Sequence, residues 1–164
     1  LEKIGKPDVL VGQFEIPMNV NEQVFSYAYK NGVKTVLNPA PANKPSDILL
    51  QNTSWFIPNE IEFEEIYGDI FNENNLLLFA KNVDTNVVVT LGEKGCAYIE
   101  NNSVKIIKAD SVKAVDTTGA GDAFVGAFSF ALASKLDIEE CLKLALKKAT
   151  DSVTKKGTQS SYKN

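Results

Sequence analysis

Short apolar runs alternate along this chain with segments whose apolar residues recur at helical spacing. The clearest run is Asn86 to Leu91, which is rich in β-branched residues. Apolar strands separated by helices are typical of a parallel sheet whose connections are helical. The sequence therefore predicts an α/β fold with a mostly parallel sheet flanked by helices.

Turn and capping residues bound each expected element. The length of 164 residues and the hydrophobic content of 44% suit a single globular domain. The expected strands cover residues 8–12, 34–38, 54–57, 86–91, 96–99 and 104–107, the last two forming a meander. The expected helices cover residues 21–31, 46–51, 59–67, 76–81, 119–133 and 138–154.

Composition excludes several classes of function. The net charge of −4 argues against binding to a nucleic-acid backbone. No apolar run is long enough to span a membrane, and no secretory leader is evident. Cys96 and Cys141 are isolated thiols without a disulfide framework, which is typical of a reducing compartment. Together, these observations lead us to expect a cytoplasmic protein that binds neither nucleic acid nor membranes.

The chain contains no histidine. This absence excludes Ser-His-Asp and Cys-His catalysis, as well as zinc sites ligated by histidine, within these residues. A carboxylate is then the expected carrier of any proton transferred near neutral pH.

The stretch VDTTGAGDAF, residues 115–124, predicts a glycine-rich turn that opens a helix. Backbone N–H groups in the first turn of a helix lack partners, and that end is electropositive, so the site suits a phosphate. Asp122 lies in this first turn, where it could receive a proton from a hydroxyl that attacks a phosphoryl group. The alternative is that Asp122 only caps the helix and the glycines only make a turn.

The longer segment DTTGAGDAFVGAF closely resembles the C-terminal signature of the ribokinase-like (PfkB) family of carbohydrate and nucleoside kinases. Neighbouring segments match in order, so the resemblance covers essentially the whole chain. It implies an incomplete three-layer, Rossmann-like fold, in which Asp122 is the catalytic base. It also implies that the backbone of Gly119, Ala120 and Gly121 forms the anion hole for the transferred phosphoryl group.

Two further segments resemble parts of the family's substrate and metal sites. In GQFEIP, Glu15 corresponds to an acid that contacts the sugar, although a solvated acid at a strand end would look the same. In the family's Asn-x-x-Glu motif, here Asn59 and Glu62, the glutamate helps to place Mg²⁺ and phosphate through water. Asn and Glu at this spacing also form an ordinary capping box, and both interpretations can hold.

The segment TLGEKG resembles the family's nucleotide loop, whose residues here are Thr90, Gly92, Glu93, Lys94 and Gly95. Its alternative is an ordinary glycine-bounded hairpin turn. VTKKGTQSS resembles the segment that wraps a potassium ion, and its alternative is an exposed basic end of a helix. The resemblance assigns to the potassium site Asp116, Thr118, Ser152, Lys155, Gly157 and Ser161.

The family's other hallmark, a Gly-rich motif with Asn and Asp residues that grip the sugar, is not found in residues 1–164. We therefore interpret the chain as the C-terminal, nucleotide-binding part of a PfkB domain, without its substrate-binding and lid half. The complete protein would be a homodimer joined through that lid. The isolated 164-residue chain is expected to be inactive, because acceptor positioning and water exclusion would come from the other half.

The resemblance predicts an ATP-dependent phosphotransferase that uses Mg²⁺ and K⁺, with a small sugar as acceptor. NPAPA, Glu15 and KKGTQSS favour the ribose-phosphorylating members, whereas adenosine kinase and fructokinase activities stay open. A non-catalytic nucleotide-binding module is a further alternative, which the presence of Asp122 disfavours. A dinucleotide-binding dehydrogenase domain would instead carry Gly-x-Gly-x-x-Gly after its first strand.

Overall fold

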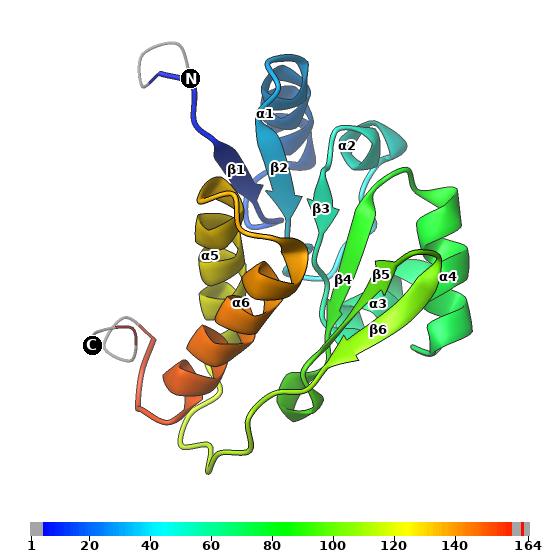
Figure 1. Cartoon of the computed structure of the whole chain (residues 1–164). Coiled ribbons are helices and arrows are strands. Elements are labelled where there is room, and N and C mark those ends of the chain that lie inside the picture. Colours follow the sequence, from blue (N-terminus) through cyan, green and yellow to red (C-terminus); the bar gives the residue numbers. More distant parts are fainter. Residues whose placement is uncertain (1–4, 159–161, 163–164) are drawn as a thin grey trace. The chain divides into compact units, whose positions relative to one another are not determined.

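Parallel pairing joins the first four strands of the chain in the order of the sequence (Figure 1). The computed structural model describes residues 5–158 and 162. Its six strands form one sheet in the order β1-β2-β3-β4-β5-β6. They are β1 (Val9–Gly12), β2 (Lys34–Leu37), β3 (Trp55–Phe56), β4 (Asn86–Thr90), β5 (Cys96–Glu100) and β6 (Ser103–Ile107). The α/β class and the mostly parallel sheet predicted from the sequence are confirmed.

Helices connect each pair of neighbouring parallel strands, as a parallel sheet requires. They are α1 (Met18–Lys30), α2 (Asp47–Gln51), α3 (Glu60–Tyr67) and α4 (Glu73–Asn82). Two further helices, α5 (Ala120–Ala133) and α6 (Ile138–Val153), follow β6. In the described part of the chain, no helix combines the length and apolar character that crossing a membrane would need.

Two of the predicted helices begin earlier than expected, α1 at position 18 instead of 21 and α4 at position 73 instead of 76. Pro17 precedes α1 and contributes no side-chain cap, so the polar residues that follow it gave no signal of a helix start. The start of α4 is set by Asn72, whose side chain accepts a hydrogen bond from the Asn75 amide. The surrounding Asn-rich sequence concealed this cap.

The chain divides into two compact units, one comprising residues 1–89 and 97–105 and the other residues 90–96 and 106–164. An aromatic cluster forms part of the core of the first unit. Phe63 lies at its centre, with its ring centroid 5.5 Å from that of Phe79 and 5.4 Å from that of Tyr67. Phe56 of β3 reaches the same cluster through Phe79, at 5.7 Å. These contacts join α3 and α4 to a central strand.

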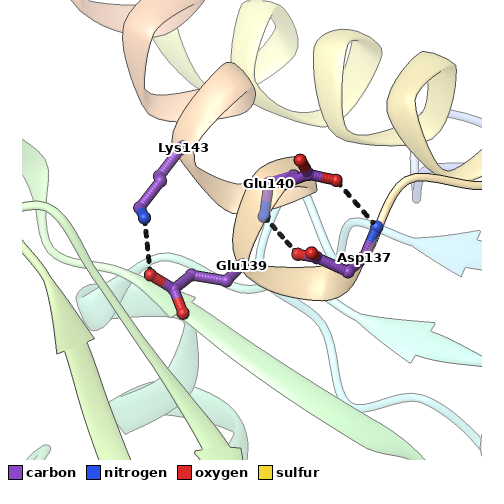
Figure 2. Close-up of polar contacts among 4 residues, drawn as sticks. All are labelled: Asp137, Glu139, Glu140 and Lys143. Carbon is purple, nitrogen blue, oxygen red and sulfur yellow. Dashed lines mark hydrogen bonds and ion pairs between the residues drawn. The ribbon is translucent and has the colours of Figure 1, made fainter.

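The second unit is built on α5 and α6, which pack against each other. Phe124 and Phe128 of α5 and Leu142 of α6 are among its fully buried side chains. The start of α6 is fixed by a reciprocal capping box (Figure 2). Asp137 accepts from the Glu140 amide at 2.8 Å, and the Glu140 carboxylate accepts from the Asp137 amide at 3.3 Å. Such a box satisfies two amides that the helix itself cannot.

The meander predicted at residues 96–107 is observed as the hairpin of β5 and β6. Its turn residues, Asn101 and Asn102, both have positive φ, at 50° and 58°. Two positive φ values in succession are the requirement of the type I′ turn, which matches the twist of the flanking strands. Cys96 and Cys141 are both buried free thiols, and burial raises the pKa of the Cys96 thiol to about 12.

A tight turn follows β4 at residues 91–95. It contains a short 3₁₀ segment, Gly92–Lys94, closed by a hydrogen bond from the Leu91 amide to the Gly95 carbonyl at 2.8 Å. Gly95 adopts φ 108° and ψ −131°, a combination open essentially to glycine alone. A Cβ atom at Gly95 would also overlap the carbonyl oxygen of Ile107.

Replacing Gly95 with alanine should therefore lower the free energy of unfolding by about 3 kcal/mol or more. Gly92 is the matched control, because it also has positive φ (58°) but a Cβ added there would meet no atom within 4 Å. Gly92→Ala should cost only about 1–2 kcal/mol. Urea denaturation monitored by circular dichroism measures both values. Equal costs for the two variants would show that the contact with Ile107 does not constrain this turn.

Candidate active site

The turn that precedes α5 leaves the start of that helix open. Gly119 is the N-cap in the left-handed conformation, with φ 79°. The Ala120 amide donates to the Thr117 carbonyl at 3.3 Å, whereas the Gly121 amide has no hydrogen-bond partner among the described residues. A Cβ added at Gly121 would meet no atom within 4 Å. Gly121 thus offers an amide without a partner among the described residues and open space beside it, and anion binding there stays a prediction.

Asp122 lies in the first turn of α5, and its side chain is exposed to solvent. The side chain therefore lies at the surface of this helix start. The helix dipole favours a negative charge at that position. This exposure is compatible both with the catalytic role and with a plain role at the helix start, so the catalytic role of Asp122 stays a prediction.

Asp116 ties the turn before α5 to the segment that follows α6. One of its carboxylate oxygens accepts from the Thr118 amide and the other from the Gly157 amide, each at 3.0 Å. These hydrogen bonds are the main reason that the pKa of Asp116 lies below its ordinary value. The Val115 and Asp116 amides both donate to the Val153 carbonyl, at 2.7 and 3.2 Å.

The two segments that the sequence assigned to a potassium site therefore meet. Ser152 is buried, with its hydroxyl donating to the Ala149 carbonyl at 2.7 Å, and its own carbonyl accepts from the Lys155 amide at 3.3 Å. Ser161 lies outside the described residues. Within residues 5–158 and 162, no group of three His, Cys, Asp or Glu side chains could hold a metal ion. The oxygens of these segments named here accept hydrogen bonds within the chain, and the potassium assignment stays a prediction.

Tyr162 is a residue that the sequence analysis did not identify. Its hydroxyl donates a hydrogen bond to the Gly119 carbonyl at 2.8 Å. Burial raises the pKa of this hydroxyl, and the negative charge of Asp122 raises it further. A Cβ at Gly119 would lie 2.5 Å from the Tyr162 hydroxyl, so this contact also requires glycine at position 119. A single tyrosine in a polar segment carries no sequence signal for such a role.

A pocket of about 600 Å³ extends from Asp122 along α5. It is lined by Ala123, Gly126 and Phe130 of α5 and by Leu144 of α6. Lys148, Asp151, Thr154, Lys155 and Tyr162 also line it. The candidate base thus borders a space large enough for a small ligand.

The nucleotide loop predicted at residues 90–95 also belongs to the second unit. Gly92, Glu93 and Lys94 are exposed, and Gly95 is buried. The Lys94 amide donates to the Leu91 carbonyl at 3.1 Å, so the backbone is held in one conformation. The glycine-bounded turn predicted for this segment is confirmed. Its role as a nucleotide loop stays a prediction.

In the first unit, Asn59 and Glu62 form the capping box of α3. The Asn59 side chain accepts from the Glu62 amide, and the Glu62 carboxylate accepts from the Asn59 amide, each at 2.8 Å. Only 8% of Glu62 is exposed, and this burial raises the pKa of its carboxyl. The capping interpretation is confirmed, whereas the predicted role toward Mg²⁺ stays a prediction.

Three strand ends meet near the remaining candidate, Glu15. Gln13 follows β1 and donates its side-chain amide to the Asn38 side chain at 3.2 Å, while Asn38 donates to the Ile57 carbonyl at 2.9 Å. The Phe14 amide donates to the Ala40 carbonyl at 2.9 Å. Glu15 is exposed in this loop. The carboxyl ends of parallel strands are where α/β proteins bind ligands.

The predicted site residues are thus distributed over both units. Glu15, Asn59 and Glu62 belong to the first unit. Thr90 to Gly95 and all the candidates from Asp116 onward belong to the second unit, apart from Ser161, which the structure does not describe.

Comparison with known proteins gives consistent matches along the chain. Residues 8–164 match the family model of the pfkB carbohydrate kinases. A ribokinase of Haemophilus influenzae is 41% identical over 165 residues, which cover 97% of this chain and 54% of the ribokinase. A deoxyribokinase of Salmonella typhi is 36% identical over 167 residues, covering 98% of this chain and 55% of the relative.

Solved structures of ribokinases have the same fold as this chain. The structure of Arabidopsis thaliana ribokinase complexed with ribose and ATP superimposes with a TM-score of 0.87 and 29% identity, covering 94% of this chain and 52% of that one. The predicted ribokinase-like fold is thereby confirmed. The chain spans about half the length of the relatives that it matches.

The buried carboxyl of Glu62 predicts a specific pH dependence of stability. Because its pKa is raised above the ordinary value of 4.5, the stabilising contribution of this carboxyl is complete below that value. The contribution is lost as the pH rises through the pKa of the folded state. Glu62→Gln keeps an acceptor for the Asn59 amide but does not titrate.

The free energy of unfolding of the unmodified chain, minus that of Glu62→Gln, should therefore fall as the pH rises above the ordinary value of 4.5. Urea titrations across this range measure the difference. Glu73→Gln, at an exposed acid in the first turn of α4, is the matched control for replacing a carboxyl by an amide at a helix start. A difference that rises with pH would contradict the assignment of burial as the dominant effect on Glu62.

Proposed function

Because this chain belongs to the PfkB family of carbohydrate kinases, we propose that it is the C-terminal, nucleotide-binding part of an ATP-dependent kinase that phosphorylates ribose. The observation that carries the proposal is the open start of α5. There the exposed Asp122 adjoins the amide of Gly121, which has no partner within residues 5–158 and 162. Phosphoryl transfer needs positioning and charge neutralisation more than covalent chemistry from the protein. This helix start offers both.

In the proposed reaction, the Asp122 carboxylate accepts the proton of the sugar hydroxyl as its oxygen bonds to the γ-phosphorus of ATP. The bond from that phosphorus to the β,γ-bridging oxygen breaks, and ADP leaves with the electron pair. The amide of Gly121, with Gly119 and Ala120 shaping the turn, donates to the transferred group. These donors are preorganised, so they stabilise the developing charge without reorganisation during the step.

The metal ions enter this proposal through named residues. Glu62, held by Asn59, would contact Mg²⁺ through water, as suits an ion that retains most of its waters. Asp116, Thr118, Ser152, Lys155 and Gly157 would surround K⁺, with Ser161 as a further candidate. When bound, these ions neutralise phosphate charge and rigidify the loop before α5. The meeting of the 116–118 and 152–157 segments supports the potassium assignment.

The proposed acceptor is a pentose. Ribokinases and deoxyribokinases are both among the relatives at 36–41% identity, so 2-deoxyribose is the second candidate. Glu15, at the carboxyl end of β1, is the proposed sugar contact of this chain. The nucleotide would lie against the backbone of Thr90, Gly92, Glu93, Lys94 and Gly95.

Titration calorimetry of the 164-residue chain tests the nucleotide site. We expect ATP-Mg to bind, and to bind more weakly when K⁺ is replaced by choline at the same ionic strength. Ribose-dependent ADP release from the isolated chain should stay at the background rate, because acceptor positioning is incomplete. Failure to bind ATP-Mg would count against the nucleotide-binding assignment. Ribose-dependent turnover would contradict the proposal that a further half is required.

Asp122→Asn separates the proposed catalytic role from a structural one. The variant should keep the affinity for ATP-Mg within about twofold and, in a kinase completed by the N-terminal half of a relative, lower turnover about 10²–10⁴-fold. Asp151→Asn changes another exposed acid of the same pocket and should leave both quantities unaltered. Stopped-time assays of ADP release with saturating ribose, 2-deoxyribose, fructose and adenosine give the turnover and identify the acceptor. Equal losses in both variants would remove the special role of Asp122.

A further inference from the structure

One chain of hydrogen bonds joins the carboxyl ends of three neighbouring strands of the first unit. β1, β2 and β3 pair in parallel and end in register (Figure 1). Gln13, Asn38 and Ile57 are the residues that directly follow them. The Gln13 side chain donates to Oδ1 of Asn38 at 3.2 Å, and Nδ2 of Asn38 donates to the Ile57 carbonyl at 2.9 Å. The side chain of Asn38 thus links all three strand ends.

Asn38 is a polar residue at a position that otherwise suits an apolar one. Only 8% of it is exposed, and the preceding Val36 and Leu37 are completely buried. A buried amide costs free energy unless its polar atoms are paired. The Ile57 carbonyl can only accept, so the NH₂ group of Asn38 must face it, which leaves the oxygen for Gln13. Each polar atom of the amide has a partner, and the side chain is held in one orientation.

One arm of this chain of hydrogen bonds leads to the turn that carries Glu15. Asn21, which is buried in α1, donates its side-chain amide to the Gln13 carbonyl at 2.8 Å. The Phe14 amide donates to the Ala40 carbonyl at 2.9 Å. Glu15 follows directly and is exposed. The backbone position of this acid is therefore set from α1 and from the segment after β2.

The other arm leads to the start of α3. Ile57 is buried, and its carbonyl accepts from Asn38. Pro58 follows, and its ring restricts the backbone between Ile57 and the N-cap residue Asn59. The Asn59 amide in turn donates to the Glu62 carboxylate at 2.8 Å. A side chain that fixes Ile57 therefore also fixes the backbone that holds Glu62.

We propose that Asn38 is a positioning residue, which sets the turn that carries Glu15 and the start of α3 that carries Glu62 relative to each other. The inference rests on the proposed function, in which Glu15 contacts the sugar and Glu62 contacts Mg²⁺ through water. Asn38 itself contacts neither ligand in this proposal and acts through Gln13 and Ile57. A directional amide with paired polar atoms suits this task, because a satisfied buried network rigidifies the segments that it joins.

Two substitutions in the 164-residue chain separate the two arms. Asn38→Leu removes both hydrogen bonds of the amide, whereas Gln13→Leu removes only the donor to Asn38. Thr35→Val is the matched control. Thr35 is also fully buried on β2 and donates to the Asn52 carbonyl at 2.6 Å, but it lies toward the amino end of the strand. The control therefore removes a buried hydrogen bond without touching the strand ends beside Glu15 and α3.

Native-state amide hydrogen exchange, measured for each residue by NMR, reports the effect on the backbone. Relative to the amides of β4, Asn38→Leu should speed exchange of the Phe14 and Asn59 amides about fivefold, the effect of losing one typical hydrogen bond. Gln13→Leu should speed exchange at Phe14 alone. Thr35→Val should change neither ratio, although it lowers the stability of the unit as a whole.

Titration calorimetry with ATP gives a readout that a merely structural role would not alter. In the proposed enzyme, Mg²⁺ strengthens ATP binding through Glu62. Asn38→Leu should therefore lower the ratio of the affinities measured with Mg²⁺ and with EDTA about tenfold, as is usual for groups that orient a metal ligand. The affinity in EDTA should equal that of the unmodified chain. Thr35→Val should leave the ratio unaltered.

The outcomes separate this inference from the proposed function. Unchanged exchange at Phe14 and Asn59 in Asn38→Leu would overturn the positioning role and leave the kinase proposal standing. Equal effects of Thr35→Val, or an unaltered affinity ratio in Asn38→Leu when the unmodified chain responds to Mg²⁺, would overturn it as well. An unmodified chain that binds ATP no better with Mg²⁺ than with EDTA would refute the proposed role of Glu62, and the exchange rates would still decide whether Asn38 joins the two segments.

Discussion

The carboxylate of Asp116 holds the turn before α5 in place, and the candidate site depends on that turn. It accepts one hydrogen bond from the Thr118 amide of its own turn and one from the amide of Gly157, which lies 41 positions further along the chain. The Val153 carbonyl accepts hydrogen bonds from the Val115 and Asp116 amides and so joins the same segments a second time. Tyr162 adds a third link through the Gly119 carbonyl. Directional hydrogen bonds therefore orient the start of this helix, in addition to the apolar packing of Phe124 and Val125. Because those bonds lower the pKa of Asp116, the arrangement persists when the solution is mildly acidic.

Much of this arrangement could be predicted from residue order alone. The run VVVT of β4 and the glycine turn that opens α5 have strong local signals, namely β-branching and the left-handed conformation that Gly119 must adopt. Helix starts without such signals were misplaced, as at Pro17 and Asn72. The role of Tyr162 could not be predicted, because its partner is distant in sequence and its neighbours give no periodic pattern. The roles assigned to the potassium candidates depend on family resemblance, since a site of carbonyl oxygens leaves no trace in side-chain identity.

Glu62 illustrates how a structural and a functional role can share one side chain. The capping box fixes its position through two hydrogen bonds of 2.8 Å, and its burial disfavours the charged form. A bound divalent cation would have the opposite effect, because it stabilises the carboxylate. Metal binding and ionisation of Glu62 are therefore linked in the proposed enzyme. The same rigidity that caps α3 would hold the carboxylate in the geometry needed for a water-mediated contact.

The exposure of Asp122 has a consequence for selectivity. A base that faces open solvent at a phosphate site can accept a proton from water as readily as from a sugar, and the product would then be inorganic phosphate. A kinase avoids this loss by covering its base only when the acceptor is present. In the proposed enzyme, the N-terminal half would exclude water from the space beside Asp122 and supply the missing sugar contacts.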